Sequence, residues 1–288
     1  MRHALSLVGV AGLVLGWCGS ALAGVVVTST QTDLDTKKAN PSTAYIDTDR
    51  AKFVNADNIM IFRGDLNRVW MIEPQKKSYM EWTPATIQQM AGQVAGANAQ
   101  MAAAMAQMQA EMAKLPPEQR AQMEAMMAGR GGLGGLAGGR GAAPAAPQVS
   151  YIKAGGSKTV AGWSCDQYRK TVNGQQEEDI CIARIAATGF SQADFQVLER
   201  FSAFMAPLMS RPGVPKNDTM DWSDMNKAIG FQGVPLDTVM YSGGRPNMQQ
   251  TVNKAERTAI PASTYELPAG FTKQEVPNIG APGGRGPR

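Results

Sequence analysis

The cysteines are the residues of this chain best suited to covalent chemistry. Cys18 lies in the apolar start of the chain, and Cys165 and Cys181 lie together in its second half. Fifteen residues separate Cys165 from Cys181, whereas a redox centre typically uses a close pair such as C-x-x-C. If the chain is exported, the oxidising compartment favours a structural disulfide between Cys165 and Cys181.

Methionine is the second candidate, because thioether sulfur is a ligand that Cu(I) prefers. Met105, Met108 and Met112 follow one another at spacings of four and three, which places them on one face of a helix. Any buried apolar stripe has the same spacing, and this stripe also contains Ile87 and Val94, which cannot bind a metal. We therefore expect packing and no bound metal, with a Cu(I) site as the sharper alternative.

Residues for acid–base or nucleophilic catalysis are few. The single histidine, His3, lies in the apolar leader. Asp47 and Asp49 share a strand face in YIDTDR, but basic neighbours indicate a solvated surface. Ser157 and Lys158 in AGGSK are too short a match to a Ser-Lys hydrolase and indicate a Gly-rich turn. We therefore expect no enzyme activity and no cofactor, and keep an unrecognised hydrolase as a further alternative.

The first 23 residues have the pattern of a secretory signal peptide. A short basic start precedes an apolar stretch from Leu5 to Trp17 and the small residues Ala21-Leu22-Ala23. The pattern predicts cleavage after Ala23 and a periplasmic or secreted protein that is not transmembrane. A bulky Trp17 next to Cys18 fits a lipoprotein acylation box poorly, so we do not expect a lipid anchor at Cys18.

The charge of the mature chain excludes one class of partner. Removing the leader takes away Arg2, so the formal charge falls from +4 to +3. This excess is too small to indicate nucleic-acid binding, and the RGG-like pieces resemble solvated linker.

The elements that must position these residues begin with short strands between Gly24 and Thr83. Thr83-Pro84 is a typical helix start, with a hydroxyl cap and proline in the first turn. An apolar stripe follows at helical spacing until Pro116-Pro117. Its members are Ile87, Met90, Val94, Ala97, Met101, Met105, Met108, Met112 and Leu115. Their neighbours are almost uncharged, so the stripe predicts an apolar cover or partner-binding face rather than a membrane-surface helix.

The segment after this helix divides the chain. We expect a second short helix over 118–127, which makes 84–127 a Met-rich helical insertion. Residues 128–147 are Gly, Ala and Pro with little to bury, which is typical of a flexible linker. The remaining 24–276 should form one β-rich domain, and 277–288 a disordered tail.

Strands resume at Val149 and lead to a predicted hairpin. A three-residue loop, Val172-Asn173-Gly174, would pair Cys165 directly with Cys181 on one sheet face. A two-residue Asn-Gly turn would shift the register by one and place the cysteines on opposite faces. After the hairpin we expect a helix capped by Ser191 that ends before Pro212, and then strands that include PLDTVMYS, MQQTVNKAER and ASTYELP.

Three quoted segments carry a family resemblance. NIMIFRGDLNRVWMIEPQKKSYMEW, TVAGWSCDQYRKTV and TAIPASTYELPAGFTK resemble an exported bacterial family, domain of unknown function 4412. The resemblance covers residues 44–273 apart from the insertion and linker, and the family is distantly similar to periplasmic lipoprotein carriers and outer-membrane lipoprotein receptors. It implies an α+β, β-rich fold: a curved antiparallel half-barrel with helices on its concave side. In the carriers that concavity holds acyl chains.

The sequence therefore predicts a non-enzymatic exported protein that binds an apolar lipid or acyl ligand, or an envelope protein. The candidate binding or covering residues are Ile87, Met90, Val94, Met101, Met105, Met108, Met112 and Leu115. The alternatives are a scaffold with a filled core and a Cu(I)-binding protein.

Overall fold

A computed structural model describes residues 23–114, 116, 148–209 and 222–276 of the 288-residue chain. The expected signal peptide apart from its last residue, the second helix over 118–127, the linker over 128–147 and the tail over 277–288 lie outside these residues. No helix in the described ranges is long and apolar enough to cross a membrane.

The described chain is rich in strands. They are β1 (Ala23–Asp33), β2 (Ala39–Ile46), β3 (Arg50–Val54), β4 (Ile59–Arg63), β5 (Arg68–Glu73), β6 (Ser78–Trp82), β7 (Val149–Val160), β8 (Trp163–Val172), β9 (Gln175–Arg184), β10 (Gly233–Ser242), β11 (Arg245–Ala259) and β12 (Thr272–Gln274). The α-helices are α1 (Pro84–Lys114), α3 (Gln196–Met209) and α4 (Trp222–Ile229). Short 3₁₀ helices are η1 (Pro74–Lys76), η2 (Ile185–Ala187), η3 (Gln192–Phe195) and η5 (Ala262–Tyr265).

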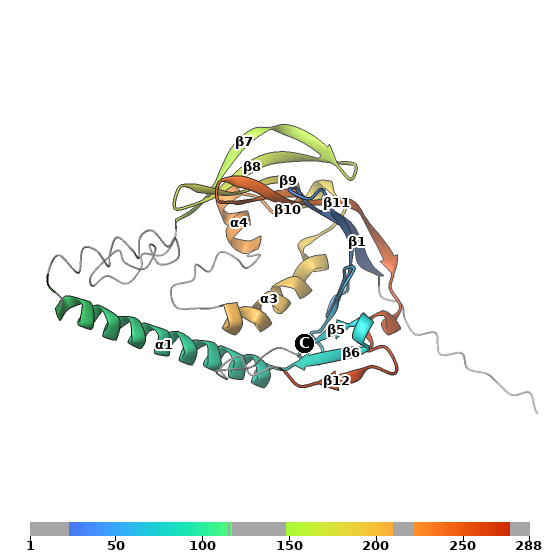
Figure 1. The fold of residues 1–288 in the computed structure, drawn as a ribbon. Helices are drawn as coiled ribbons and strands as arrows, with labels where there is room; N and C mark the ends of the chain where they lie inside the picture. Colours follow the sequence, from blue (N-terminus) through green and yellow to red (C-terminus); the bar gives the residue numbers. More distant parts are fainter. Residues whose placement is uncertain (1–22, 115, 117–147, 210–221, 277–288) are drawn as a thin grey trace, which may run out of the picture.

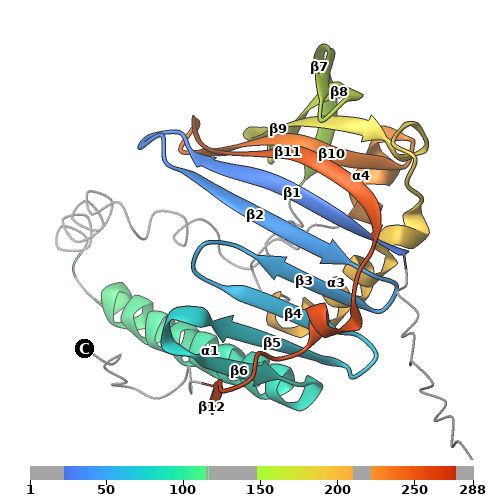
Figure 2. The same ribbon diagram turned by 90° about the vertical axis from the view of Figure 1, so that its right-hand side faces the viewer.

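These strands form one curved, unclosed sheet in the order β12-β6-β5-β4-β3-β2-β1-β11-β10-β9-β8-β7 (Figures 1 and 2). Every pair is antiparallel except β12 with β6. The β-rich class and the curved antiparallel sheet are therefore confirmed. The long pairing of β1 with β11 joins the meander β1–β6 to the meander β7–β11.

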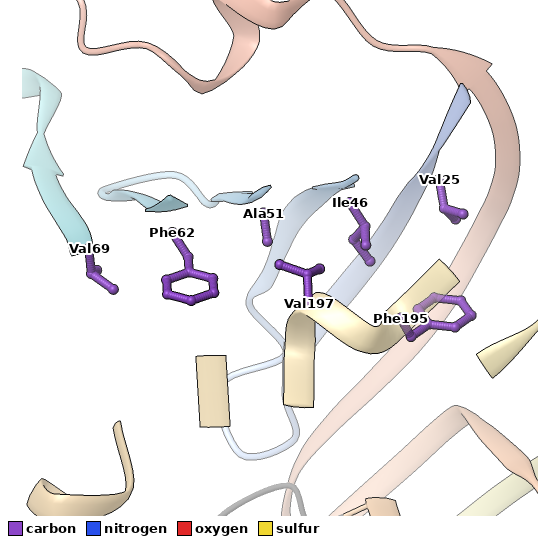
Figure 3. Packing of buried hydrophobic residues seen from close by; sticks show 7 residues of the cluster. All are labelled: Val25, Ile46, Ala51, Phe62, Val69, Phe195 and Val197. Atoms are coloured by element: carbon purple, nitrogen blue, oxygen red, sulfur yellow. The ribbon is translucent and has the colours of Figure 1, made fainter. Parts of the chain in front are cut away.

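A row of directly opposed apolar side chains runs across one face of β1 to β5. Its members are Val25, Ile46, Ala51, Phe62 and Val69, and all are buried (Figure 3). The row follows from the alternation of strands, because residues that face each other across a ladder point to the same side of the sheet. This face is where α3 packs.

Two side chains cover this row: Phe195, the last residue of η3, and Val197 in the first turn of α3 (Figure 3). Farther along the helix, Phe201 lies against Phe62 with ring centroids 5.4 Å apart. The expected helix start at Ser191 is confirmed. Ser191 and Asp194 form a capping box, in which the side chain of each residue accepts a hydrogen bond from the backbone N–H of the other. The sheet curves around α3 and α4 in Figure 1.

The sequence analysis missed helix α4. Its Met225 is buried with Tyr168 and Ile180 of β8 and β9. Trp222, Met225 and Ile229 recur at spacings of three and four, which is a short helical pattern that could have indicated this element.

On the other sheet face, the first four residues of ASTYELP form the helix η5, and the segment is not the expected strand. A strand would hold Tyr265 beside the sheet, whereas the 3₁₀ turn folds its ring onto Ile61 and Ile72, where Tyr265 is fully buried. The gain in buried aromatic area explains why the chain leaves the extended conformation here.

The hairpin before Cys181 also differs from expectation. Its loop is the two-residue turn Asn173-Gly174, with positive φ at both residues, and Val172 faces Gln175. A bulge after Lys170 then shifts the register by one more residue. The two shifts together keep Cys165 and Cys181 on the same face, but the expected direct opposition is wrong: Cys181 faces Gln167, and Cys165 lies diagonally across from it.

Candidate functional site

A groove of ≈ 380 Å³ lies between the start of α1, the end of α3 and the β4–β5 turn. It is lined by Asn67, Pro84, Ile87, Gln88, Arg200, Ala203, Phe204 and Pro207. Ile87 is buried and Phe204 half-buried, so these two form an apolar base. The other lining residues are exposed, so the groove is open to solvent along its rim.

The first turns of α1 hold the helix in place. Thr83 Oγ1 accepts a hydrogen bond from the backbone of Thr86 at 3.3 Å, which confirms the expected helix start. Ile87 is 1% exposed and Met90 is 9% exposed, whereas Val94 is half-buried. Among the stripe members whose side chains the structure describes, the first three are therefore packed.

Three later members of the stripe are exposed to solvent. Ala97 is exposed, Met101 is 63% exposed and Met108 is 39% exposed. In Figure 1 the second half of α1 extends away from the sheet. The side chains of Met105 and Met112, and the whole of Leu115, lie outside the described residues. The expected cover thus ends near Val94 in this structure, and Met101 and Met108 are uncovered.

The helix α3 supplies the opposite wall, and ion pairs fix its position. Arg200 donates to Asp49 at 2.6 Å, and Arg257 of β11 donates to Asp194 at the start of the helix at 2.8 Å. Burial raises the pKa of Asp194, but hydrogen bonds from Ser191 and Arg257 outweigh this effect and hold the pKa below its ordinary value. The groove therefore has one charged wall residue, Arg200, which an acidic partner already balances.

The paired carboxylates do not form a site. Asp47 and Asp49 lie in the turn between β2 and β3, and they bind different partners. The expectation of a solvated strand face is wrong for Asp47, which is 3% exposed and accepts from Arg50 at 2.6 Å. The Arg50 guanidinium in turn lies 4.9 Å from the centroid of the Tyr265 ring. This contact with Tyr265, which the sequence analysis placed in a strand, explains the burial.

Ser157 and Lys158 lie in strand β7 and not in a turn. Ser157 donates to Asp166, and Lys158 Nζ reaches Asp237 of β10 at 2.5 Å. Burial raises the pKa of Asp237, but hydrogen bonds from Lys158, Thr251 and Gln249 prevail and lower it overall. Because Ser157 and Lys158 bind separate carboxylates, they do not form a nucleophile and base.

The expected disulfide is confirmed. Cys165 and Cys181 are bonded, their Cα atoms lie 5.3 Å apart, and both side chains are buried. They pack with Ala183 and Leu236 between neighbouring strands. The bond therefore joins β8 to β9 inside a packed cluster.

Metal binding finds limited support in the described ranges. They contain no group of three or more His, Cys, Asp or Glu side chains that could hold an ion. The Cu(I) hypothesis rests on Met105, Met108 and Met112, of which only Met108 has a described side chain, and it stays a hypothesis.

Two of the residues that line the groove, Pro84 and Ile87, were named from the sequence, although no groove was predicted there. The lining residues that were not singled out are Asn67, Gln88, Arg200, Ala203, Phe204 and Pro207. Phe204 follows Phe201 by three residues, and this spacing could have placed it near the buried side of its helix. The meeting of α1 with α3 depends on residues more than a hundred positions apart.

Comparisons with known proteins identify one family. Residues 139–271 match the model described as domain of unknown function (DUF4412). The quoted strand from Thr159 to Val172 lies in this range, as does nearly all of the closing segment, while the quoted residues 58–82 lie outside it. No curated protein matches the chain.

Solved structures give weaker likenesses. The match to the PNGF-II structure covers 88% of this chain and 31% of PNGF-II, with 9% identity and a TM-score of 0.35. The match to the MucB structure covers 88% of this chain and 60% of MucB, with 9% identity and a TM-score of 0.35. The match to the MucA/MucB complex of Pseudomonas aeruginosa covers 87% of this chain and 56% of the other chain, with 10% identity and a TM-score of 0.35.

The chain thus spans between about a third and three fifths of the length of these proteins. Such low TM-scores carry no argument about function. The family match is the finding that stands, and it confirms the expected family over the matched part of the chain. Residues 139–271 are similar to the family described as domain of unknown function DUF4412.

Proposed function

We propose that this protein is an exported, non-enzymatic binding protein that holds an apolar segment of an envelope protein. The segment lies along α1 and enters the groove between α1 and α3. One observation carries the proposal: the apolar stripe of α1 continues from the groove base at Ile87 to Met101 and Met108, which are 63% and 39% exposed. Met101 and Met108 lie two turns apart on one face of α1, and an exposed apolar face supports an interaction site.

The composition of α1 suits a protein partner. Between Pro84 and Lys114 the only charged residues are Glu111 and Lys114, so the helix lacks the basic face of a membrane-surface helix. Methionine side chains are unbranched and adapt to differently shaped partners. An amphipathic helix or extended segment could therefore bury Met101 and Met108 together.

An acyl chain is the alternative occupant. Sites for small apolar ligands usually enclose 70–90% of the ligand surface. Most of the residues that line this groove are exposed, so an acyl chain bound here would keep much of its surface in water. A polypeptide segment fits an open groove better, because it brings its own polar surface for the solvent side.

We also propose that the sheet is a half-barrel of the lipoprotein-carrier kind and that α3 and α4 occupy its concave side. The packing of α3 on the Val25–Val69 row and of α4 on Ile180 supports this arrangement. The leader pattern of residues 1–23 supports export, to the periplasm or outside the cell.

Native mass spectrometry of the protein purified from its own cells tests the function. The variants are Met101→Glu, which places a charge on the stripe, and Ala103→Glu, which places it about 200° around the same helix. We expect a co-purified polypeptide with the wild type and with Ala103→Glu. Its yield should fall at least tenfold with Met101→Glu, because a buried unpaired charge is costly.

The other outcomes each identify a rival. An adduct of lipid mass lost in Met101→Glu would establish the acyl alternative, and a copper adduct would establish the metal alternative. Free protein in every sample, or equal losses in the two variants, would favour the scaffold with a filled core.

A further inference from the structure

Methionine sulfur is the chemically reactive group that the α1 stripe exposes. Among the methionine side chains that the structure describes, only Met101 and Met108 are exposed to solvent, at 63% and 39%. The other described methionine side chains are half-buried or buried, and Met90 of the same helix is 9% exposed. A dissolved oxidant therefore reaches the sulfur atoms of Met101 and Met108 more easily than that of Met90.

The two exposed methionines share one helix face with small neighbours. Met101 and Met108 are seven positions apart, so about 10.5 Å of axial rise separates them on the same side of α1. Ala104 lies between them on this side, and Ala97 lies one turn before Met101. Both alanines are exposed, and a single methyl group is too short to shield a methionine sulfur.

The apolar character of this face therefore depends on few atoms. Ala97 and Ala104 contribute one methyl group each, so the side chains of Met101 and Met108 supply most of the described apolar surface in this part of α1. Oxidation converts an apolar thioether into a polar sulfoxide. Two oxidation events would thus change the whole described face from apolar to polar.

We propose that Met101 and Met108 are a peroxide-sensitive modification site whose oxidation releases the partner segment from α1. The modification follows from the exposure of the two sulfur atoms, whereas the release rests on the proposed function of the stripe as a partner surface.

The reaction needs only the protein and hydrogen peroxide. The thioether sulfur donates an electron pair to one peroxide oxygen, the O–O bond breaks, and an S–O bond forms. The departing hydroxide takes the proton from the transferred oxygen and becomes water. The sulfur is oxidised by two electrons and the peroxide is reduced by two, so the products are one sulfoxide and one water for each methionine.

Oxidation at these positions should act on the complex and leave the fold intact. In the free protein the sulfoxides of Met101 and Met108 remain in water, because these side chains are already exposed. In the complex the same groups would be buried against an apolar segment without a hydrogen-bond partner, which is costly. Met225 of α4 is 5% exposed beside Tyr168 and Ile180, so the fold protects it from the oxidant.

The first experiment tests the modification without any partner. The purified full chain is treated with hydrogen peroxide, and peptide mass spectrometry follows the sulfoxide at each methionine. We expect Met101 and Met108 to be oxidised about tenfold faster than Met90 and Met225, because burial keeps the oxidant from the latter pair. Protein unfolded in urea is the control, and there the four rates should become equal.

The second experiment tests the release. Peroxide is added to the protein purified from its own cells, and native mass spectrometry measures the co-purified polypeptide in the unseparated sample. The bound fraction should fall about tenfold, because the complex would bury polar sulfoxides. It should return after treatment with the two methionine sulfoxide reductases, one for each sulfoxide epimer.

A double variant, Met101→Leu with Met108→Leu, identifies the residues responsible. Leucine keeps an apolar side chain of similar size but has no sulfur, so this variant should retain the polypeptide after the same peroxide treatment. The variant keeps Met105 and Met112 and exposes the partner to the same oxidant. It therefore separates oxidation of Met101 and Met108 from oxidation of other methionines and of the partner.

Three results would overturn the proposal. They are equal oxidation rates of the four methionines in the folded chain, an unchanged bound fraction after oxidation of the wild type, and equal loss of the polypeptide from the leucine variant. Absence of a co-purified polypeptide from every untreated sample would refute the proposed function and the release that rests on it. The oxidation rates decide the modification site independently of that outcome.

Discussion

At the scale of single residues, two tyrosine hydroxyl groups lie in opposite situations. The Tyr265 hydroxyl is buried and makes no hydrogen bond within the described residues, whereas Tyr241 donates to Asp179 at 2.8 Å. Burial, and secondarily the nearby Asp47, raise the pKa of Tyr265. A buried hydroxyl without a partner costs stability, while one with a partner contributes to it.

We therefore predict opposite effects of the same substitution. Tyr265→Phe should raise the free energy of unfolding by about 1 kcal/mol, and Tyr241→Phe should lower it by about 1 kcal/mol. Urea unfolding of both variants measures the difference. If both variants lose stability equally, Tyr265 has a hydrogen-bond partner that this account lacks.

Asp237 should make the stability of the protein depend on pH. Its pKa is lower in the folded state than the ordinary value of an aspartate, so its contribution to stability is present above the unfolded pKa and is lost as the pH falls through the folded pKa. Asp237→Asn should cost about 2 kcal/mol at pH 7, because it removes a charged acceptor from Lys158, Thr251 and Gln249.

Unfolding of Asp237→Asn and wild type from pH 7 to pH 2 measures this contribution. The difference in unfolding free energy should narrow below about pH 4, because the unfolded carboxylate takes up a proton there while the folded carboxylate takes it up only at lower pH. Asp224→Asn on α4, where 70% of the side chain is exposed, is the control and should follow the wild type throughout. A gap that stays constant with pH would contradict the assigned pKa direction.

Sequence reasoning at this scale succeeded where the cause was local. The Cys165–Cys181 bond and the Ser191 cap were predicted, because composition and short spacing determine both. The burial of Asp47 and the pairing of Lys158 were not. Arg50, which pairs with Asp47, lies over the ring of Tyr265, and Lys158 pairs with Asp237. Tyr265 and Asp237 lie far away in the sequence and become neighbours of these residues only in the fold.

At the scale of elements, α1 combines a packed beginning with an exposed continuation. We predict that Ile87→Ala costs about 3 kcal/mol, because a fully buried branched side chain leaves a cavity. Met101→Ala should change the free energy of unfolding by less than about 0.5 kcal/mol. Chemical unfolding of both variants tests this contrast. A large loss with Met101→Ala would mean that the stripe is part of the core.

The disulfide is an element-scale staple between β8 and β9. Replacing both cysteines by alanine should lower the free energy of unfolding by about 3 kcal/mol in the loop-entropy model. Alkylation of the unfolded, unreduced mature protein should find no free thiol. Two free thiols, or unchanged stability of the double variant, would show that the bond is absent from the native protein.

The hairpin shows why element boundaries were easier to predict than register. The Asn173-Gly174 sequence is a strong turn signal, yet the register also depends on a bulge after Lys170. The position of a bulge depends on the packing on both faces of the sheet, and no local sequence pattern in this hairpin indicates the bulge. The disulfide was predicted correctly, although the assumed three-residue loop and the direct opposition of the two cysteines were wrong.

At the scale of the whole molecule, the curved sheet depends on one pairing between strands that are far apart in the sequence. The pairing of β1 with β11 brings Val25 opposite Arg257 and unites the two meanders. Alternating strands and the family resemblance predicted a β-rich curved sheet. Local patterns contain no information on which distant strands pair, so neither this joint nor the groove between α1 and α3 could be derived from them.

The central claim is that the exposed stripe of α1 is a binding surface. Site-specific photo-crosslinking in intact cells tests it most directly, with a photoreactive residue at position 101, 108 or 103 of the full chain. We predict that positions 101 and 108 crosslink to the same partner protein, and that position 103 gives at least tenfold less of this product. Equal yields from all three positions, or no crosslinked protein from 101 and 108, would contradict it.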